Sequence, residues 1–199
     1  MDAPPAGKGP RERADAARNR ARILAAAARI VAAHGVEGLA MADVAAAAGV
    51  GVGTLYRRFG DRSGLAYALI DEREREFQAA FIEGPAPLGP GASGTARIRA
   101  FLHALVDRTV AQLDLLVMAE TASPLARFGA AYDLHHSHLA MLIAQVKPDG
   151  DAYYLADALL APLAAPLLAH RLRTGGVTVE RVKAGLDDLL SGLEAAPTG

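Results

Sequence analysis

The sequence contains no cysteine and no tryptophan, and only 5% of its 199 residues are aromatic. Without cysteine the chain can form neither disulfides nor thiolate metal sites, a composition that fits a cytoplasmic protein. No stretch offers about 18 uncharged apolar residues in a row, as a membrane-spanning helix would require. The polar N-terminus lacks the apolar segment of a secretory signal. We therefore expect a soluble, cytoplasmic protein.

Signatures of catalysis are also missing from the sequence. No serine lies in a nucleophile-elbow pattern, and neither an H-E-x-x-H motif nor a paired-carboxylate motif is present. The sequence thus predicts that the protein is not an enzyme and needs no cofactor.

What the sequence does contain is alanine and leucine, which supply most of its 52% hydrophobic residues. Both are among the best helix formers, whereas the β-branched runs of alternating polarity that are typical of strands are nearly absent. The sequence therefore predicts an all-α fold.

Charge is distributed unevenly along the chain. Residues 1–64 carry 10 Lys and Arg against 6 Asp and Glu, a net charge of +4. The whole chain has 21 Lys and Arg and 22 Asp and Glu, so residues 65–199 carry 11 against 16, a net charge of −5. A basic N-terminal third suggests that this part contacts a polyanion, although ordinary surface variation is an alternative.

Apolar spacing and turn residues divide the chain into helices and loops. Residues 1–12, rich in proline, glycine and charge, are expected to be disordered. Two prolines, Pro162 and Pro166, predict a bend within the seventh helix. The expected helices span residues 14–34, 41–48, 52–59, 62–82, 95–120 (with a possible break near residue 113), 123–146, 149–174 and 178–194. The expected domains are a disordered arm (1–12), a helix-turn-helix domain (13–60), a linking helix (61–83) and a C-terminal domain (84–199).

The stretch GVGVGTLYRRFGDR, residues 49–62, carries the clearest functional signal. Its glycines resemble a dinucleotide-binding turn, but that turn must follow a strand, and the preceding AMADVAAAA has no strand pattern. The alternative is a helix, a tight turn and a second helix that lies on DNA. Seven residues are the candidate DNA contacts: Val52, Gly53, Thr54, Tyr56, Arg57, Arg58 and Arg62.

The spacing G-T-L-Y-x-x-F behind A-x-x-A-G-V resembles the tetracycline-repressor (TetR) family of bacterial transcriptional regulators, in detail over about residues 18–70. The resemblance implies a homodimer of nine-helix subunits whose first three helices bind DNA. It further implies that a linking helix joins them to a C-terminal ligand-binding and dimerisation domain. The residues matching Thr54 and Tyr56 would lie on DNA, and the one matching Arg62 would meet a phosphate.

The chain departs from the family pattern at three positions. Ala40 stands where a capping Thr or Ser is usual, and Gly51 stands where Ser is frequent. Ala42 has no hydrogen-bonding group at a position that can read a base. Base readout is therefore expected to fall on Val52, on Thr54 and on one of the paired arginines. Three further arginines, at 18, 20 and 22, could reach a phosphate or simply line a solvated helix face.

Beyond residue 84 the sequence predicts an interface and a pocket. Apolar residues recur at helical spacing on the last two predicted helices, which favours a four-helix dimer interface formed by Leu159, Leu163, Leu167, Val182, Leu186 and Leu189; closing the subunit's own core is the alternative. A pocket for a small apolar or amphipathic molecule is expected at His103, Met118, Phe128, Tyr132 and His136; plain packing of these side chains in the core is the alternative. His135 and His138 share a helix face, but surface or pocket histidines are the preferred interpretation over zinc ligands.

These features predict a ligand-responsive, sequence-specific transcriptional regulator, most simply a repressor that a small molecule releases from its double-stranded DNA operator. One alternative is a DNA-binding dimer that needs no effector. The other is a small-molecule-binding protein whose DNA binding is impaired at Ala40 and Ala42.

Overall fold

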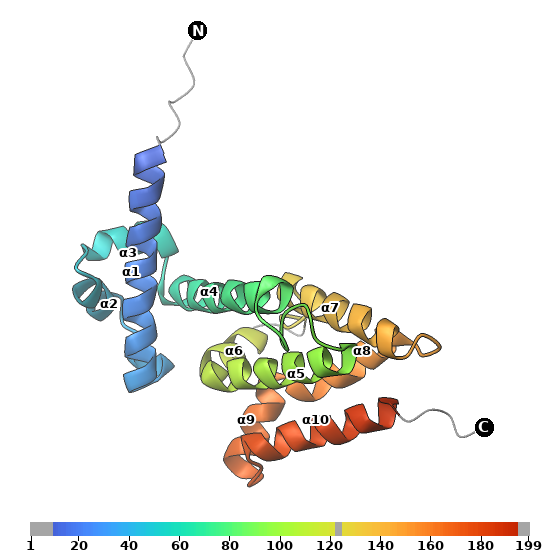
Figure 1. Cartoon of the computed structure of the whole chain (residues 1–199). Coiled ribbons are helices and arrows are strands. Elements are labelled where there is room, and N and C mark those ends of the chain that lie inside the picture. The colour runs from blue at the N-terminus through green and yellow to red at the C-terminus, as the bar shows by residue number, and fades with distance from the viewer. Residues whose placement is uncertain (1–9, 122–124, 195–199) are drawn as a thin grey trace. The chain divides into compact units, whose positions relative to one another are not determined.

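The computed structural model describes residues 10–121 and 125–194, and these residues are helical with no strand among them. The chain divides into two compact units, Met1–Leu69 and Ile70–Gly199, with the boundary inside helix α4. The all-α prediction is confirmed. The order of the elements along the chain is shown in Figure 1. They are α1 (Pro10–His34), the 3-10 helix η1 (Val36–Gly38), α2 (Met41–Ala48), α3 (Val52–Phe59), α4 (Arg62–Glu83), α5 (Gly94–Ala111), α6 (Leu113–Glu120), α7 (Ala130–Val146), α8 (Ala152–Leu160), η2 (Ala161–Leu163), α9 (Ala165–Thr174) and α10 (Val179–Glu194).

The N-terminal unit packs α1 against α2 and α2 against α3. Its core is made of small and branched apolar side chains from all of its helices, including Ile23, Leu39, Val44, Leu55 and Leu65, each at most 1% exposed. Alanines at 26, 27 and 45 are also buried there, which lets the short helices approach α1 closely. The unit extends to Leu69, so the first turns of α4 belong to its core and not only to a linker.

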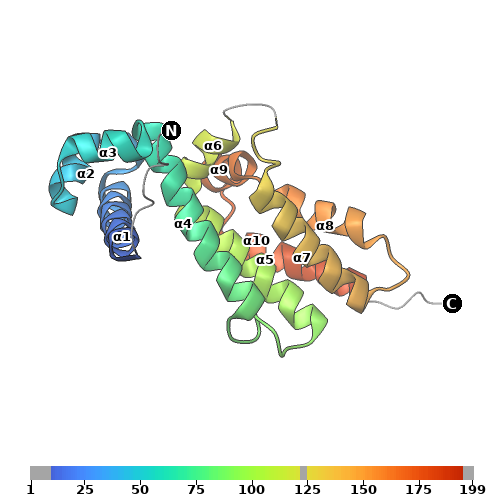
Figure 2. The ribbon, with the colours of Figure 1, turned by 90° about the horizontal axis from the view of Figure 1, so that it is seen from above.

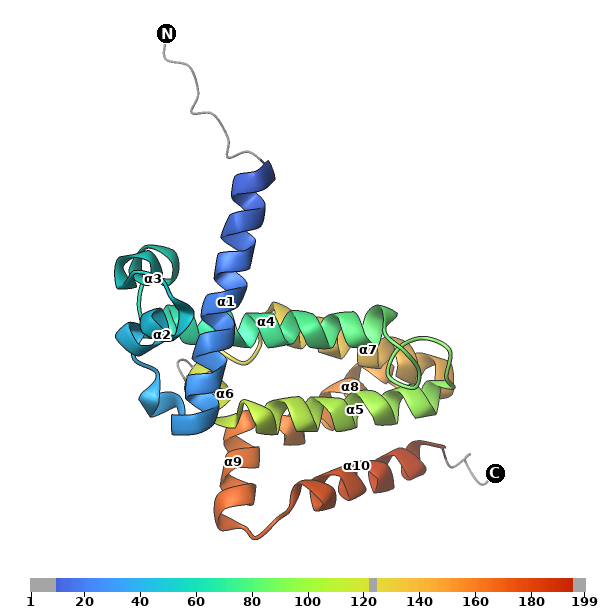
Figure 3. The ribbon, with the colours of Figure 1, turned by 60° about the vertical axis from the view of Figure 1, so that its left-hand side comes forward.

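The C-terminal unit is a bundle in which α7 packs beside α8 and α5 packs beside α7, as Figure 2 shows from above. Helix α10 lies along α5, and α6 contacts α9 (Figure 3). The centre is aromatic: Phe81 and Phe101 are fully buried and meet edge to face with ring centroids 5.1 Å apart. Each such pair adds roughly 0.5–1.5 kcal/mol to the area it buries.

Two helix breaks lie where the sequence suggested a bend or a break. The predicted helix 149–174 is interrupted at Ala164, so that α8 and α9 are separate, because Pro166 cannot continue the hydrogen-bonding of the preceding helix. The break considered near residue 113 is present, since Gln112 separates α5 from α6. Residues 10–121 and 125–194 therefore contain ten α-helices instead of the nine that the resemblance implied.

Two helix starts also differ from the sequence prediction. Helix α1 begins at Pro10, so the last residues of the expected disordered arm are helical, while residues 1–9 lie outside the described residues. Helix α7 begins at Ala130 instead of at residue 123, and Leu125–Gly129 form turns and bends. Ser123 and Pro124, which were expected to open that helix, lie outside the described part of the chain.

Among the described residues, no single helix is long and apolar enough to cross a membrane. The bent pair Ala152–Leu163 and Ala165–Thr174, with 43° between its halves, meets that test only when taken together, by length and composition.

Candidate nucleic-acid interface and cavity

A tight turn joins α2 to α3 and sets the direction of α3. Gly49 ends α2 in the left-handed region, with φ 65° and ψ 42°, where an L-residue is strained. The Gly49 N–H donates to the Ala46 carbonyl at 3.1 Å, and the Val50 N–H donates to the Ala45 carbonyl at 3.0 Å. This pair of bonds is the Schellman motif, which satisfies the last carbonyls of the helix. The chain can then reverse within three residues and begin α3 at Val52.

Helix α3 is held to the unit by one fully buried side chain. Leu55 is 0% exposed, whereas Val52 and Tyr56 are 43% and 53% exposed. Arg57, Arg58 and Gly53 are exposed as well, and Thr54 and Phe59 are half-buried. Apart from Leu55 and its half-buried neighbours, α3 thus presents glycine, hydroxyl and guanidinium groups to solvent. An amphipathic helix with this exposed chemistry suits a nucleic-acid groove, since arginine and tyrosine contact phosphates and base edges.

The starts of α2 and α3 have no side-chain caps. Ala40 is the N-cap of α2 and Gly51 that of α3, and neither side chain can accept a bond from the first turn. Residues 51–53 at the start of α3 are exposed, and the positive end of a helix dipole favours a phosphate.

Helix α4 begins with a capped turn. The Asp61 carboxylate accepts a hydrogen bond from the Gly64 N–H at 2.8 Å, as expected of an N-cap aspartate. Arg62, predicted to meet a phosphate, donates to the Val36 carbonyl of η1 and lies 3.5 Å from the Glu37 carboxylate. In this structure Arg62 therefore also ties α4 to the segment between α1 and α2.

The arginines early in α1 lie on the surface of its first turns. Arg18 pairs with Asp15, and Arg22 donates to Asn19 at 3.3 Å. Their local partners are exposed and hold the side chains along the helix. Exposed pairs of this kind contribute little to stability and can be exchanged for a phosphate.

The five residues predicted to bind a ligand lie on different elements of the C-terminal unit. Three of them form an aromatic row on α7 and the segment before it: Phe128 meets Tyr132 with ring centroids 5.0 Å apart, and Tyr132 stacks with His136 at 6.1 Å. The Tyr132 hydroxyl donates to Asp157 at 2.7 Å, and burial together with this carboxylate raises the pKa of Tyr132 to about 12.

The other two predicted ligand contacts lie elsewhere in the C-terminal unit. His103, on α5, is 3.0 Å from Asp187 on α10. Met118, on α6, is 37% exposed.

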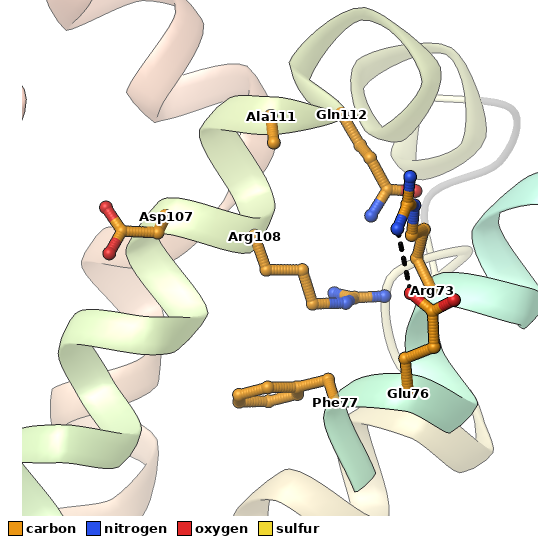
Figure 4. Close-up of a pocket in the computed structure, with 7 residues that line it drawn as sticks. All are labelled: Arg73, Glu76, Phe77, Asp107, Arg108, Ala111 and Gln112. Carbon is orange, nitrogen blue, oxygen red and sulfur yellow. Dashed lines mark hydrogen bonds and ion pairs between the residues drawn. The ribbon is translucent and has the colours of Figure 1, made fainter. Parts of the chain in front are cut away.

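A cavity of about 460 Å³ lies between α4 and α5 in the C-terminal unit (Figure 4). None of the predicted ligand residues lines it. Arg73 and Glu76 form an ion pair of 2.8 Å at its edge, and the Arg108 guanidinium extends into it over the Phe77 ring, 5.9 Å from the centroid. The lining residues are Arg73, Glu76, Phe77, Asp107, Arg108, Ala111 and Gln112.

Arg108 also belongs to a buried charged cluster that the sequence did not reveal. Glu74 on α4 is 6% exposed. One of its carboxylate oxygens lies 2.8 Å from His135 Nε2, and the other lies 2.6 Å from Arg108 Nη2. Burial acts to raise the pKa of Glu74, but the hydrogen bond and charge of His135 and the charge of Arg108 outweigh it and lower the pKa. Glu74 is therefore ionised. In the sequence it sits in the run EREREF, which is typical of a solvated helix face.

The two histidines considered as metal ligands have other roles. His135 holds Glu74, and the His138 ring packs against Phe81 and Phe101 at 4.4 Å and 5.1 Å between centroids. Burial, reinforced by the charges of Arg97 and His135, lowers the pKa of His138 to about 4. Across residues 10–121 and 125–194, no group of three or more acidic or histidine side chains is arranged to hold a metal ion.

The six residues predicted for a dimer interface fall into two sets. Leu159, Leu163 and Leu186 are each 3% exposed inside the core of the C-terminal unit, and Val182 is half-buried against it. These four serve the subunit's own core, which was the alternative at the sequence level. Leu167 and Leu189, at 40% and 54% exposed, remain open for contact with a partner.

The N-terminal unit matches known proteins in sequence. The family described as "Bacterial regulatory proteins, tetR family" matches residues 23–69. An HTH-type transcriptional regulator of Staphylococcus aureus (strain USA300) is 45% identical over 58 residues, which cover 29% of this chain and 31% of that protein. The match thus spans about a third of the relative's length.

Solved structures extend the likeness in fold to most of the chain. A TetR-family transcriptional regulator from Streptomyces coelicolor is 25% identical with a TM-score of 0.65, covering 90% of this chain and 97% of that one. A TetR-family regulator from Pectobacterium atrosepticum has 22% identity and a TM-score of 0.68, over 93% and 98% of the two chains.

A regulator from Saccharomonospora viridis, solved in complex with choline, is 21% identical with a TM-score of 0.67, covering 88% of this chain and 96% of that one. Because these sequence identities are low, the structural likeness is evidence for the helical fold alone. Together with the match over residues 23–69, it identifies the N-terminal unit as a helix-turn-helix domain of the tetR family of bacterial regulatory proteins.

Proposed function

We propose that the protein is a cytoplasmic, sequence-specific DNA-binding transcriptional regulator that acts as a homodimer and responds to a small molecule, most simply as a repressor. The observation that carries this proposal is the surface of α3, where Leu55 is fully buried while Val52, Tyr56, Arg57 and Arg58 face solvent. A short helix anchored by one leucine leaves its remaining side chains available for a major groove.

Each exposed group of α3 has a role in this proposal. Val52 can contact a thymine methyl group, and the Tyr56 hydroxyl can donate to a phosphate or to a base edge. Arg57 and Arg58 follow in the last turn of α3, where they can neutralise phosphates of the DNA backbone. Thr54 is half-buried as a residue, and we assign it to positioning α3 on the DNA more than to reading a base.

A homodimer is proposed because one short helix gives too small an interface for specific binding. Two copies of α3 in successive major grooves would read an inverted repeat with half-sites about 34–36 Å apart. Leu167 and Leu189, the exposed members of the predicted interface, are the contacts we assign to the partner subunit.

The response to a small molecule is assigned to the cavity beside Phe77 and Arg108. Its volume of about 460 Å³ falls within the range of ordinary ligand sites, roughly 300–1,000 Å³. A structural relative from Saccharomonospora viridis holds choline, which supports a small organic effector for this fold without identifying the one used here. The aromatic row of Phe128, Tyr132 and His136 is the second candidate site.

The test uses a duplex enriched by the protein from random DNA and fluorescence anisotropy of the full chain on it. Tyr56→Phe should weaken binding by about fivefold, because it removes one hydrogen bond of about 1 kcal/mol. Arg58→Ala should reduce the slope of log K against log salt by about 0.9, the value of one phosphate contact.

A matched control is Arg181→Ala, which removes the same charge from an exposed position on α10. It should leave both the affinity and the salt slope unchanged. If Arg181→Ala weakens binding as much as Arg58→Ala, the protein responds only to its net charge, and α3 is not the DNA surface.

A further inference from the structure

Arg108 places a buried positive charge in the wall of the cavity. Its side chain is 12% exposed, and its Nη2 lies 2.6 Å from Oε2 of Glu74, whose side chain is 8% exposed. Figure 4 shows the guanidinium projecting from α5 toward the α4 side of the cavity, with the Phe77 ring beneath it. The positive charge of Arg108 in the cavity wall is therefore balanced by the carboxylate of Glu74 on α4.

The contact between these two groups is short but poorly hydrogen-bonded. Among the described residues, neither Arg108 Nε nor Glu74 Oε2 has a hydrogen-bond partner of acceptable geometry. A guanidinium binds a carboxylate best through two parallel N–H···O bonds, which give both strength and direction. Glu74 does not supply that arrangement, so Arg108 retains capacity for a better-oriented anion.

Glu74 also has partners that do not depend on Arg108. Its Oε1 receives a hydrogen bond from Gln78 Nε2 at 2.8 Å, and His135 Nε2 lies 2.8 Å from the same atom. If Arg108 turned to another anion, the Glu74 carboxylate would remain hydrogen-bonded. Arg108 has no second carboxylate in direct contact among the described ion pairs, and burial lowers its pKa against the charges of Glu74 and the more distant Glu120.

The other charges around the cavity are already paired. Glu76 is bound to Arg73 at 2.8 Å, and Asp107 is 2.6 Å from Lys183 of α10. A cationic ligand would find both acids engaged and would face Arg108, whereas an anionic ligand would find a buried guanidinium next to an aromatic ring. The charge arrangement thus favours an anion with an apolar part.

We propose that the effector is a carboxylate-bearing small molecule whose carboxylate pairs with Arg108 in place of Glu74, with its apolar part against Phe77. This inference rests on the proposed function, because it identifies the class of ligand for the same cavity. Binding would replace an ion pair between α4 and α5 by one between α5 and the ligand. Helix α4 also supplies Leu65 and Leu69 to the N-terminal unit, so a change in what restrains α4 is a route from the cavity to the DNA-binding helices.

The first test needs only the wild-type chain and pairs of ligands that differ in charge. Isothermal titration would compare phenylacetate with phenylacetamide and octanoate with octanamide, and would include choline as a cation of similar size. At least one acid should bind about tenfold more tightly than its amide, the effect of one charge-assisted pair. The proposal is overturned if the amides bind as well as the acids, if choline displaces them, or if no acid binds at millimolar concentration.

Variants then locate the carboxylate within the cavity. Glu74→Gln keeps the size and removes the competing charge, so it should raise the affinity for the acid about tenfold, while Arg108→Gln should abolish the preference of acid over amide. The matched control is Arg73→Gln, an exposed arginine of the same cavity, which should keep that preference. Loss of the preference in Arg73→Gln but not in Arg108→Gln would refute the assignment.

Circular dichroism of each variant checks its fold, and the wild-type comparison remains decisive should Arg108→Gln fail to fold. DNA binding without ligand is measured on the same samples, so that the two proposals can fail separately. Intact DNA binding with no preference for acids removes only the ligand class. If the chain prefers acids over amides but binds no DNA, the proposal of a DNA-binding regulator is refuted and the ligand class stands.

Discussion

Replacing Gly49 with alanine tests whether the turn between α2 and α3 has the backbone conformation described here. Gly49 has φ 65°, and a Cβ added there would meet no atom within 4 Å. A steric clash therefore contributes nothing to the free-energy cost of Gly49→Ala, and that cost comes from the backbone conformation alone. Gly51, two residues later, has φ −69° and the same open surroundings, which makes it a matched control.

The magnitude follows from two opposing effects. A left-handed conformation costs an L-residue about 1–2 kcal/mol. Alanine also restricts the unfolded chain relative to glycine, which returns about 0.4–1 kcal/mol at either position. Gly49→Ala should therefore destabilise the turn by roughly 1 kcal/mol. At Gly51 the same gain is offset by the weaker N-cap of alanine, so that variant should lie near zero.

Hydrogen–deuterium exchange on the full chain is the appropriate assay because it reports each unit separately. Peptides covering residues 41–59 should exchange about fivefold faster in Gly49→Ala than in the wild type, since 1.4 kcal/mol corresponds to tenfold. Peptides of the C-terminal unit should be unchanged in both variants. Equal protection in Gly49→Ala and the wild type, or a larger loss in Gly51→Ala, would refute the turn geometry.

Three further predictions concern a cap, a buried histidine and the subunit contact. Asp61→Ala removes the acceptor of the Gly64 N–H and should cost about 1 kcal/mol in thermal unfolding of the N-terminal unit; no change in melting would show that the cap is not formed. The pKa of His138 is lowered from 6.5 to about 4, so the unfolded state binds more protons between these values, and the free energy of unfolding should fall as pH falls through that window. His138→Leu should flatten this dependence in urea titrations, and an identical pH profile would contradict it. Leu189→Asp together with Leu167→Asp should convert a dimer to a monomer in sedimentation equilibrium, whereas an unaffected dimer would place the interface elsewhere.

Local signals in the sequence sufficed for the helix-turn-helix. The bounds Met41–Ala48 and Val52–Phe59 were predicted as the structure has them, because Gly49 ends one helix and Gly51 precedes the next. The burial of Leu55 and the N-cap at Asp61 are likewise decided by neighbours within a few residues. Such features depend on backbone conformation and helical period, which a sequence displays directly.

The C-terminal unit could be predicted only in outline. Glu74 alternates with arginines as a surface residue would, and its burial depends on Arg108 and His135 from two other helices. The leucine pattern of Leu159 and Leu163 shows that one face is buried but not whether the subunit's own core or a partner buries it. Contacts between helices that are far apart in the sequence settle both questions, and periodicity carries no information about them.

The most direct test of the central claim, that α3 reads DNA sequence, is a footprint of the purified protein on the DNA flanking its own gene at several salt concentrations. If α3 reads base sequence, the protein should protect an inverted repeat, with half-sites about 34–36 Å apart, and this protection should persist at moderate salt. Diffuse protection that disappears steeply as salt rises would mean that the arginines bind only the phosphate backbone, and it would contradict the account.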